Sequence, residues 1–280
     1  MKNYGLGKLS ILVLFFWLIS IPAGLAEAAN KALILNYHHL DPNPRSSSTI
    51  SPQLFAEQMK YLKDHGYTVI SLQQLKNYLT APPTKGAANG NTGNGTLPDR
   101  AVVITFDDGY ASFYEYAYPV LKEYGFPSAM FTIAGKVSNS PNEIPKLTWA
   151  QVKEMAATGL VDFQSHTYNM HYLLDKKSAL IAEPAAKVQA DLHMAQDVLA
   201  FHTGKFIDAI AYPYGHYNNS LIHMARQEGY RFGFTLNQGT VQRGMNLMAL
   251  PRVAVGDEQT TVQEFEKVLE SGGESRGRFL

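Results

Sequence analysis

The chain contains no cysteine among its 280 residues. This absence excludes a disulfide scaffold, a cysteine-ligated zinc finger, a thiol nucleophile and lipidation at a leader cysteine. An excess of one charge sign is lacking as well, because 24 Lys and Arg residues balance 24 Asp and Glu residues. A polybasic nucleic-acid-binding protein needs a concentrated positive field. The composition therefore argues against a nucleic acid as partner.

Charged residues are scarce, at 17% of the chain, whereas hydrophobic residues make up 45%. Chains that stay disordered have the opposite balance, with low hydrophobicity and high net charge. The composition therefore excludes global disorder. A chain of this length can bury the core of one barrel-sized α/β domain or of two smaller domains.

The N-terminal segment lacks an apolar run of the usual membrane-spanning length. Lys2 and Lys8 precede the unbroken apolar run 11–19, which is shorter than the roughly 20 residues that cross a bilayer. Small residues follow, and this order is typical of a secretory leader. We expect a signal peptide over residues 1–26; cleavage after Ala28 also fits, and an uncleaved anchor is the alternative. Either way, the remainder would be secreted or associated with the cell envelope, touching a membrane only through an uncleaved leader.

A unit repeats along the remaining chain, in which an amphipathic stretch ends in Gly and an aromatic residue or Leu opens an apolar run. It occurs four times, at Gly66, Gly125, Gly159 and Gly229. Glycine just past a helix adopts the left-handed conformation that ends the helix, so each unit indicates a helix followed by a strand. Near-continuous apolar strands are typical of parallel sheets that are buried on both faces.

The pattern predicts strands that alternate with helices. The predicted strands span residues 32–37, 68–71, 101–106, 128–133, 161–165, 209–212, 231–236 and 250–255. The predicted helices span residues 52–65, 72–79, 111–124, 149–158, 185–202, 218–228 and 261–271. Repeated β–α units in a chain of this length favour a closed barrel over an open sheet. We therefore predict a single α/β domain with a TIM-like barrel over residues 31–271, and interpret the low-complexity stretch 81–98 as a flexible surface insertion without chemistry.

Polar side chains follow several of the predicted strands, at the point where each strand ends. These are Asn36 to His39, Asp107 with Asp108, His166 with His171 close behind, and Tyr212 to Gly215. The carboxyl ends of the strands share one face of a βα barrel, and active sites lie on that face. Separate segments therefore bring titratable or polar groups to one mouth of the predicted barrel.

Asp107 and Asp108 are adjacent carboxylates after an apolar strand, a costly arrangement unless another group neutralises them. Capping of the following helix is the simpler interpretation, but two acids are more than one cap requires. His166 and His171 can converge only if the segment between them leaves the strand and curls back. Two neutral imidazoles and one carboxylate would then form a zinc-type site with an open position for water, and an ordinary polar loop is the alternative.

Three motifs together resemble those of a known family: Thr-Phe-Asp-Asp-Gly-Tyr at 105–110, Ser-His-Thr with a later His at 165–171, and Tyr-Pro-Tyr-Gly at 212–215. In this order they resemble the polysaccharide deacetylases, the carbohydrate esterases with a NodB homology domain, over residues 31–256. The resemblance implies a distorted (β/α)7 barrel. It also implies metal-dependent removal of N-acetyl groups from an amino-sugar polymer, so the implied partner is a polysaccharide.

The resemblance further implies roles for individual residues. Asp107 matches the general base, and the backbone N–H of Tyr214 matches a donor to the oxyanion. Asp108, His166 and His171 match the ligands of one divalent metal ion. Zinc suits these ligand types, and Co²⁺, Ni²⁺, Mn²⁺ or Fe²⁺ could occupy the same set.

The sequence departs from the usual family pattern at several points. The longer spacing from His166 to His171 resembles the branch that includes the poly-β-1,6-N-acetylglucosamine deacetylases. No histidine follows His223, so the usual C-terminal acid is absent, and the permuted motif order of that branch assigns the acid to His38. The usual Arg before the Tyr-Pro-Tyr motif is also missing, and Arg252 is the candidate cation for the base.

Residues next to these motifs are candidates for sugar contact: Tyr110, Tyr212, Pro213 and His216. Two other functions stay open. A glycoside hydrolase needs carboxyl groups about 5 Å or about 6.5–9.5 Å apart across the bond it cleaves, and adjacent residues are poorly placed for that. A non-catalytic polysaccharide-binding protein would not need the full set of catalytic groups. The sequence also leaves open the polymer (peptidoglycan, chitin oligomers or a β-1,6-linked polymer) and the oligomeric state.

Overall fold

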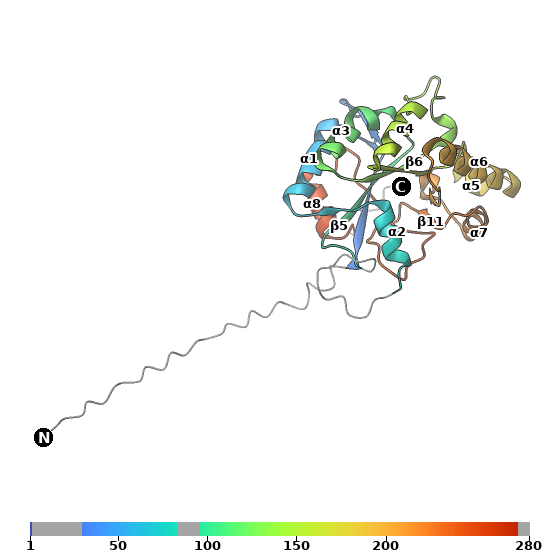
Figure 1. The fold of residues 1–280 in the computed structure, drawn as a ribbon. Helices are drawn as coiled ribbons and strands as arrows, with labels where there is room; N and C mark the ends of the chain where they lie inside the picture. Colours follow the sequence, from blue (N-terminus) through green and yellow to red (C-terminus); the bar gives the residue numbers. More distant parts are fainter. Residues whose placement is uncertain (2–29, 83–95, 274–280) are drawn as a thin grey trace.

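The computed structural model describes residues 1, 30–82 and 96–273, and the two longer segments form one domain (Figure 1). The predicted signal peptide 1–26, apart from Met1, and most of the predicted insertion 81–98 lie outside the described residues. Across the part of the chain that the structure describes, no helix is long and apolar enough to span a membrane.

A curled sheet of parallel strands forms the centre of the domain (Figure 1). Its strands lie in the order β11 (Phe232–Phe234), β10 (Ala209–Ala211), β7 (Val161–Ser165), β6 (Ser128–Thr132), β5 (Ala101–Asp107), β1 (Ala32–Tyr37) and β12 (Val253–Ala254). A further strand, β4 (Thr68–Val69), pairs with the first residues of β5. The last residues of β5 pair with β6 on the same side of the strand. Since all these pairs are parallel, the C-terminal ends of the strands meet at one end of the sheet.

The two edge strands, β11 and β12, approach each other through the segment that leads into β12. Phe234 and Leu250 form a parallel bridge, and the Thr235 N–H donates to the Leu250 carbonyl over 2.9 Å. The Arg252 N–H donates to the Asn237 carbonyl over 2.9 Å. These contacts curl the sheet into a distorted barrel, so the predicted α/β barrel fold is confirmed.

Helices pack around the sheet (Figure 1). They are α1 (Pro52–Asp64), α2 (Leu72–Thr80), α3 (Tyr118–Tyr124), α4 (Trp149–Thr158), α5 (Ala179–Ala182), α6 (Ala185–Thr203), α7 (Asn219–Gln227) and α8 (Val262–Glu270). Their ends follow chemistry that is visible in the sequence. Ser71 and Thr148 form capping boxes at the starts of α2 and α4, and left-handed Gly125 and Gly159 end α3 and α4.

The structure differs from the predicted elements in its short pieces. The predicted helix 111–124 contains a π-helix, η3 (Phe113–Ala117), and continues as α3, whose second residue is Pro119. Proline has no N–H to donate to the preceding turn, so the regular series of α-helical hydrogen bonds is interrupted at Pro119. The described elements absent from the prediction are β2 (His39–Leu40), β3 (Thr49–Ile50), η4 (Ala134–Lys136), β8 (Leu173–Leu174), β9 (Lys177–Ser178), α5 and η5 (Pro213–Gly215). Elements of two to four residues carry no periodic pattern that sequence reasoning could detect.

Alternation along the strands decides which side chains fill the barrel. Val103 of β5 packs in the cluster shared with Phe131 and Phe234, whereas its neighbour Ile104 packs in the cluster shared with the outer helices. Asp107 has the same parity as Val103 and is buried. The strand pattern therefore carries a carboxylate into the interior at the mouth of the barrel.

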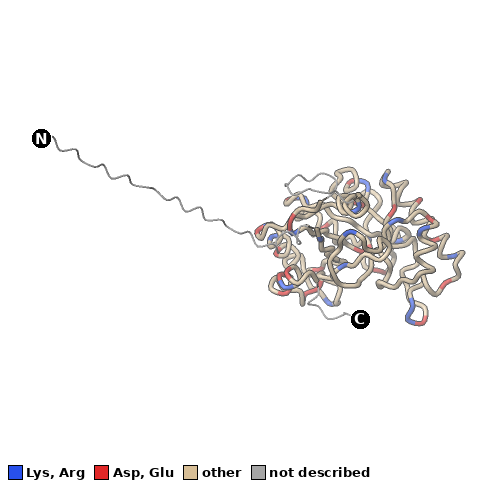
Figure 2. Tube along the Cα trace, turned by 90° about the horizontal axis from the view of Figure 1, so that it is seen from below, with Lys and Arg blue, Asp and Glu red and all other residues tan. Residues whose placement is uncertain are grey.

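Lys and Arg residues are interspersed with Asp and Glu residues along the described chain (Figure 2). Among the described Lys and Arg side chains, two are buried. Lys76 of α2 is buried, and its Nζ lies 2.5 Å from Asp208 Oδ1 at the start of β10. Arg252 is fully buried beside the carboxylate at the mouth. Buried charges need partners, and the partner of Arg252 belongs to the candidate site.

Candidate active site

β5 ends in a tight turn that separates two adjacent carboxylates. Asp107 is the last residue of the strand, whereas Asp108 adopts a left-handed conformation with a φ of 72°. Gly109 is also left-handed, and a Cβ there would lie 3.0 Å from Thr132 Cγ2. Aspartate tolerates the left-handed region better than most residues, and glycine enters it freely. The Asp-Asp-Gly sequence therefore suits a turn that sends its two carboxylates in different directions.

Asp108 meets the two histidines that follow β7. Its Oδ1 lies 3.4 Å from His166 Nε2 and 3.3 Å from His171 Nε2. One ligand atom from each residue lies within 4.8 Å of the others. Asp108 Oδ1 is buried and has no hydrogen-bond partner among the described residues. A buried carboxylate oxygen is costly to leave unpaired, so these three residues fit a bound cation.

The His166 ring is oriented by a backbone carbonyl. Its Nδ1 lies 2.8 Å from the Ala211 oxygen, and because a carbonyl only accepts hydrogen bonds, Nδ1 carries the hydrogen. In the neutral ring, Nε2 then keeps its lone pair toward Asp108, as a metal ligand requires. Burial and the neighbouring His166 lower the pKa of His171 to about 4, so this second imidazole is neutral at pH 7.

The electrostatics of the cluster favour a positive charge. Burial would lower the pKa of His166, but the Asp107 and Asp108 carboxylates outweigh it and raise that pKa. Burial would likewise raise the pKa of Asp108, but the neighbouring His166 outweighs it and lowers that pKa. The negative charge of the two carboxylates would stabilise either a proton on His166 or a metal cation. Two imidazoles and one carboxylate match the ligand set of an open catalytic zinc site.

The segment between the two histidines curls back because α6 holds it. Asp191 of α6 accepts hydrogen bonds from the Tyr168 N–H at 2.9 Å and the Asn169 N–H at 2.7 Å. Thr167 has a φ of 79°, and its hydroxyl accepts from the Met170 N–H at 3.2 Å. A threonine in the left-handed region is strained, and the Asp191 contacts hold the turn in place. This turn brings together two histidines whose spacing fits neither a helix nor a strand.

Asp107 faces the interior, where Arg252 binds it with two hydrogen bonds, of 2.8 and 2.7 Å. Asn36 donates to Asp107 Oδ2 over 3.3 Å and accepts from Arg252 over 3.0 Å. Arg252 also donates to the Thr235 carbonyl over 3.1 Å. Burial would raise the pKa of Asp107, but the Arg252 guanidinium outweighs it and lowers that pKa. The carboxylate beside the candidate metal ligands is therefore ionised at neutral pH.

The two adjacent histidines after β1 lie in different surroundings. His38 Nε2 is 3.8 Å from Asp107 Oδ2, and the His38 side chain is 21% exposed. His39 Nδ1 lies 3.4 Å from the Thr49 hydroxyl, and the His39 ring meets the Tyr110 ring edge-on with centroids 4.9 Å apart. Of the pair, His38 is the one that reaches both Asp107 and solvent.

The Tyr-Pro-Tyr turn contributes one exposed side chain to the mouth. Tyr212 is buried, and its hydroxyl donates to the Met248 carbonyl over 3.0 Å; Pro213 is buried as well. Tyr214 has a φ of 60° and is 37% exposed, and its ring stacks obliquely near His171 with centroids 4.8 Å apart. His216 is half-buried, with its ring 6.0 Å from that of Tyr214. Side-chain contact with a sugar is thus available to Tyr214 and His216, whereas Tyr212 and Pro213 support the wall.

Tyr110 forms another wall of the mouth, together with a residue that sequence reasoning missed. The Lys146 Nζ lies 3.4 Å from the centre of the Tyr110 ring. Two backbone hydrogen bonds hold this segment in place, from the Ala111 N–H to the Pro145 carbonyl at 2.9 Å and from the Leu147 N–H to the Gly109 carbonyl at 2.8 Å. Burial lowers the pKa of Lys146 to about 8, which leaves it protonated at pH 7. The lysine therefore covers one face of the Tyr110 ring.

No sequence signal marks Lys146 or Asp191 as part of the site. Lys146 is a single basic residue in a loop, and Asp191 is a single acid within an amphipathic helix. Asn36 carries a weak signal, because it is a buried polar residue within an otherwise apolar strand. Buried polar groups need partners, and its partners turn out to be Asp107 and Arg252.

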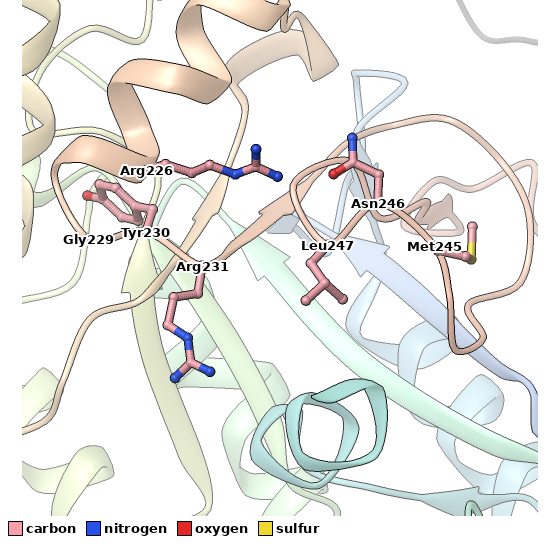
Figure 3. A pocket seen from close by; sticks show the side chains of 7 residues that line it. All are labelled: Arg226, Gly229, Tyr230, Arg231, Met245, Asn246 and Leu247. Atoms are coloured by element: carbon pink, nitrogen blue, oxygen red, sulfur yellow. The ribbon is translucent and has the colours of Figure 1, made fainter. Parts of the chain in front are cut away.

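A cavity of about 720 Å³ lies at the opposite end of the barrel (Figure 3). It is lined by Arg226, Gly229, Tyr230, Arg231, Met245, Asn246 and Leu247. These residues precede β11 and β12, whereas the polar residues described above follow the strands. The cavity is therefore separate from the Asp108 cluster.

We compared the chain with known protein families, and the family that matches is consistent with the chemistry of the candidate site. The family model for polysaccharide deacetylase matches residues 94–233. The chain belongs to this family. It therefore shares the reaction class of the family, hydrolytic deacetylation of a polysaccharide, and the resemblance predicted from the three motifs is confirmed.

Individual members of the family are similar over most of the chain. A poly-beta-1,6-N-acetyl-D-glucosamine N-deacetylase of Staphylococcus aureus is 30% identical over 253 residues, covering 85% of this chain and 83% of the relative. The solved structure of IcaB from Ammonifex degensii has a TM-score of 0.74 at 30% identity, covering 87% of this chain and 97% of that one. The deacetylase PplD of Streptococcus pyogenes, solved with acetate, has a TM-score of 0.70 at 25% identity, with coverage of 87% and 99%. Deacetylases of this family thus share the barrel described above.

Proposed function

We propose that this chain is a secreted, metal-dependent N-deacetylase that acts on a β-1,6-linked N-acetylglucosamine polymer. The observation that carries the proposal is the convergence of Asp108, His166 and His171 beside the ionised Asp107. The choice of polymer is supported by the Staphylococcus aureus relative, which is named for it, and by the longer spacing between the two histidines. Peptidoglycan and chitin oligomers are the competing polymers.

Asp108, His166 and His171 would hold one divalent cation, and the ligand types favour zinc. Bound there, the cation would polarise the acetyl carbonyl and lower the pKa of a water molecule. The buried and unpartnered Asp108 Oδ1 supports this assignment. So does the Ala211 carbonyl, which fixes the hydrogen of His166 on the nitrogen away from the cluster.

The residues of the chain would then move the protons. Asp107 would take one proton from the attacking water, held in place by Arg252 and Asn36. The backbone N–H of Tyr214 would donate to the developing oxyanion. His38 would protonate the departing amine, so that the amide and water become acetate and a sugar amine. His38 is supported in this role because it lies next to Asp107 and is partly open to solvent.

The proposed location depends on the leader. Residues 1–26 carry the charged, apolar and small-residue order of a signal peptide. Export would bring the enzyme to a polymer that lies outside the cytoplasm. Expression of the full chain followed by cell fractionation and N-terminal sequencing tests this part; full-length protein in the cytoplasm would contradict it.

Acetate release tests the activity. The purified domain should release acetate from the β-1,6-linked polymer faster than from chitin oligomers or peptidoglycan. Activity should disappear with a chelator and return with zinc. Acetate release that survives complete metal removal would contradict the metal assignment, and new reducing ends without acetate would favour a glycoside hydrolase instead.

Two variants separate the roles of the adjacent carboxylates. Asp108→Ala should lose metal and turnover together, whereas Asp107→Asn should keep the metal and lose turnover. Full metal occupancy in Asp108→Ala would remove Asp108 from the ligand set. Near-normal turnover in Asp107→Asn would remove Asp107 as the base. Exposed Asp197 of α6 offers a control, since Asp197→Ala should change neither quantity.

A further inference from the structure

Lys146 stands out at the mouth because no described carboxylate forms a close ion pair with it; Asp108 and Glu143 act on its charge only from a longer distance. No carboxylate of the described residues lies within ion-pair distance of its Nζ, whereas Lys136, in the same loop, pairs with Glu143 at 2.5 Å. The Tyr110 ring beneath the Nζ stabilises the ammonium through its face. A half-buried lysine held in this way is a fixed positive charge rather than a mobile surface group.

The position of that charge is set by the backbone beside the candidate metal ligands. Residues 145–147 pair with residues 109–111, directly after Asp108, through hydrogen bonds of 2.9 and 2.8 Å and a bridge between Tyr110 and Lys146. The row formed by His39, Tyr110 and Lys146 therefore lines the mouth on the side of β5. A polymer that presents one unit to Asp108 would lay a neighbouring unit along this row.

We propose that Lys146 is a specificity-determining residue that disfavours polymer segments already carrying a free amine. This inference rests on the proposed function, since deacetylation turns a neutral N-acetyl unit into a cationic ammonium unit. An ammonium beside Lys146 is repelled, whereas an acetylated unit is not. The enzyme would thus act preferentially where neighbouring units are still acetylated, and its product would carry spaced rather than adjacent amines.

Coulomb's law gives the expected size of the effect. Two unit charges roughly 6 Å apart repel each other enough to change a rate by about 3-fold in water-like surroundings and about 100-fold in protein-like surroundings. Such repulsion weakens as salt is added. The wild-type enzyme should therefore prefer the fully acetylated substrate by a factor within this range, and the preference should shrink at high ionic strength.

Two defined oligomers test the proposal. One is the β-1,6-linked pentamer of N-acetylglucosamine, and the other carries a single free amine on an internal unit. The ratio of their kcat/KM values for acetate release is measured with the metal-loaded enzyme. Lys146→Met should bring the ratio close to one, Lys146→Arg should preserve it, and Lys136→Met should leave it at the wild-type value. Lys146→Gln replaces Lys146→Met if the methionine variant fails to fold.

An unchanged ratio in Lys146→Met, or in its glutamine replacement, would overturn the proposal. A wild-type ratio of one would overturn it as well. Acetate release from neither oligomer is a separate result, because it would contradict the proposed function and not only the role of Lys146. Metal content and melting temperature of each variant show that a changed ratio reflects charge rather than a damaged site.

Discussion

Asp107 and Asp108 are neighbours in the chain but face different partners. Asp107 continues the inward parity of β5 and is bound by Arg252, while the left-handed turn directs Asp108 to His166 and His171. At the scale of the residue, one change of backbone conformation lets two adjacent carboxylates take separate proposed roles. The assignments can therefore be tested one side chain at a time.

Removal of Arg252 should destabilise the fold as well as the site. Arg252→Met would leave the buried Asp107 without its cation, and breaking a buried ion pair in this way costs about 3–5 kcal/mol. We expect the urea midpoint to fall accordingly and turnover to be lost. Arg231 is exposed, so Arg231→Met should stay within about 0.5 kcal/mol of the wild type. Equal midpoints for the two variants would show that the pair contributes little to stability.

His38 and His39 form a matched pair for testing the proposed acid. General acid–base groups typically contribute about 10²–10⁴-fold in rate, so His38→Ala should lower turnover on that scale. Metal content and melting temperature should stay close to wild type, because His38 lies partly exposed. His39→Ala should be much milder, since His39 faces Thr49 and Tyr110 instead. If His38→Ala keeps most of its turnover, the acid is another group.

The sequence predicts the helices and strands whose ends are set by local residues. It does not predict features that depend on contacts between distant segments of the chain. The strand 161–165 and the helix 149–158 agree with prediction at both ends, since a capping box and a left-handed glycine mark them. The break at Pro119 and the two-residue strands follow from local detail that periodicity does not carry. The residues of the three motifs were visible as polar groups at strand ends. Lys146 and Asp191 were not, because each matters only through a contact with a distant segment.

Asp191 offers a test of how the loop after β7 positions its histidines. Asp191→Ala would remove the acceptor for the Tyr168 and Asn169 N–H groups and free the strained turn at Thr167. Loss of a group that orients metal ligands typically lowers metal affinity about 10–100-fold. We expect a loss of that size in a competition titration with a chromogenic chelator.

The control for this prediction lies on the same helix. Asp197 is exposed, and its ion-pair partner among the described residues is exposed His193, so Asp197→Ala should leave metal affinity unchanged. Asp191→Asn keeps one carbonyl oxygen and should fall between the two. Wild-type metal affinity in Asp191→Ala would show that the turn holds its shape without the carboxylate.

In the whole molecule, the site combines residues from the first and the last strands of the chain. β1 supplies Asn36 and leads to His38, β5 supplies Asp107, and the approach to β12 supplies Arg252. The sheet order places β5 and β12 on either side of β1. Arg252 also donates to the Thr235 carbonyl directly after β11, so the same side chain connects the mouth to the other edge of the sheet.

A metal ion at Asp108, His166 and His171 would link the end of β5 to the segment after β7, so metal binding should stabilise the entire domain. A ligand at 100 times its dissociation constant adds about 2.7 kcal/mol to the free energy of unfolding. For a domain of this size, each kcal/mol raises the melting temperature by about 2–4 °C. We therefore expect zinc to raise the melting temperature of the metal-free wild type by about 5–10 °C. Asp108→Ala should show no such rise, because it lacks the carboxylate that joins the two histidines. A rise of the same size in that variant would place the stabilising metal at another site.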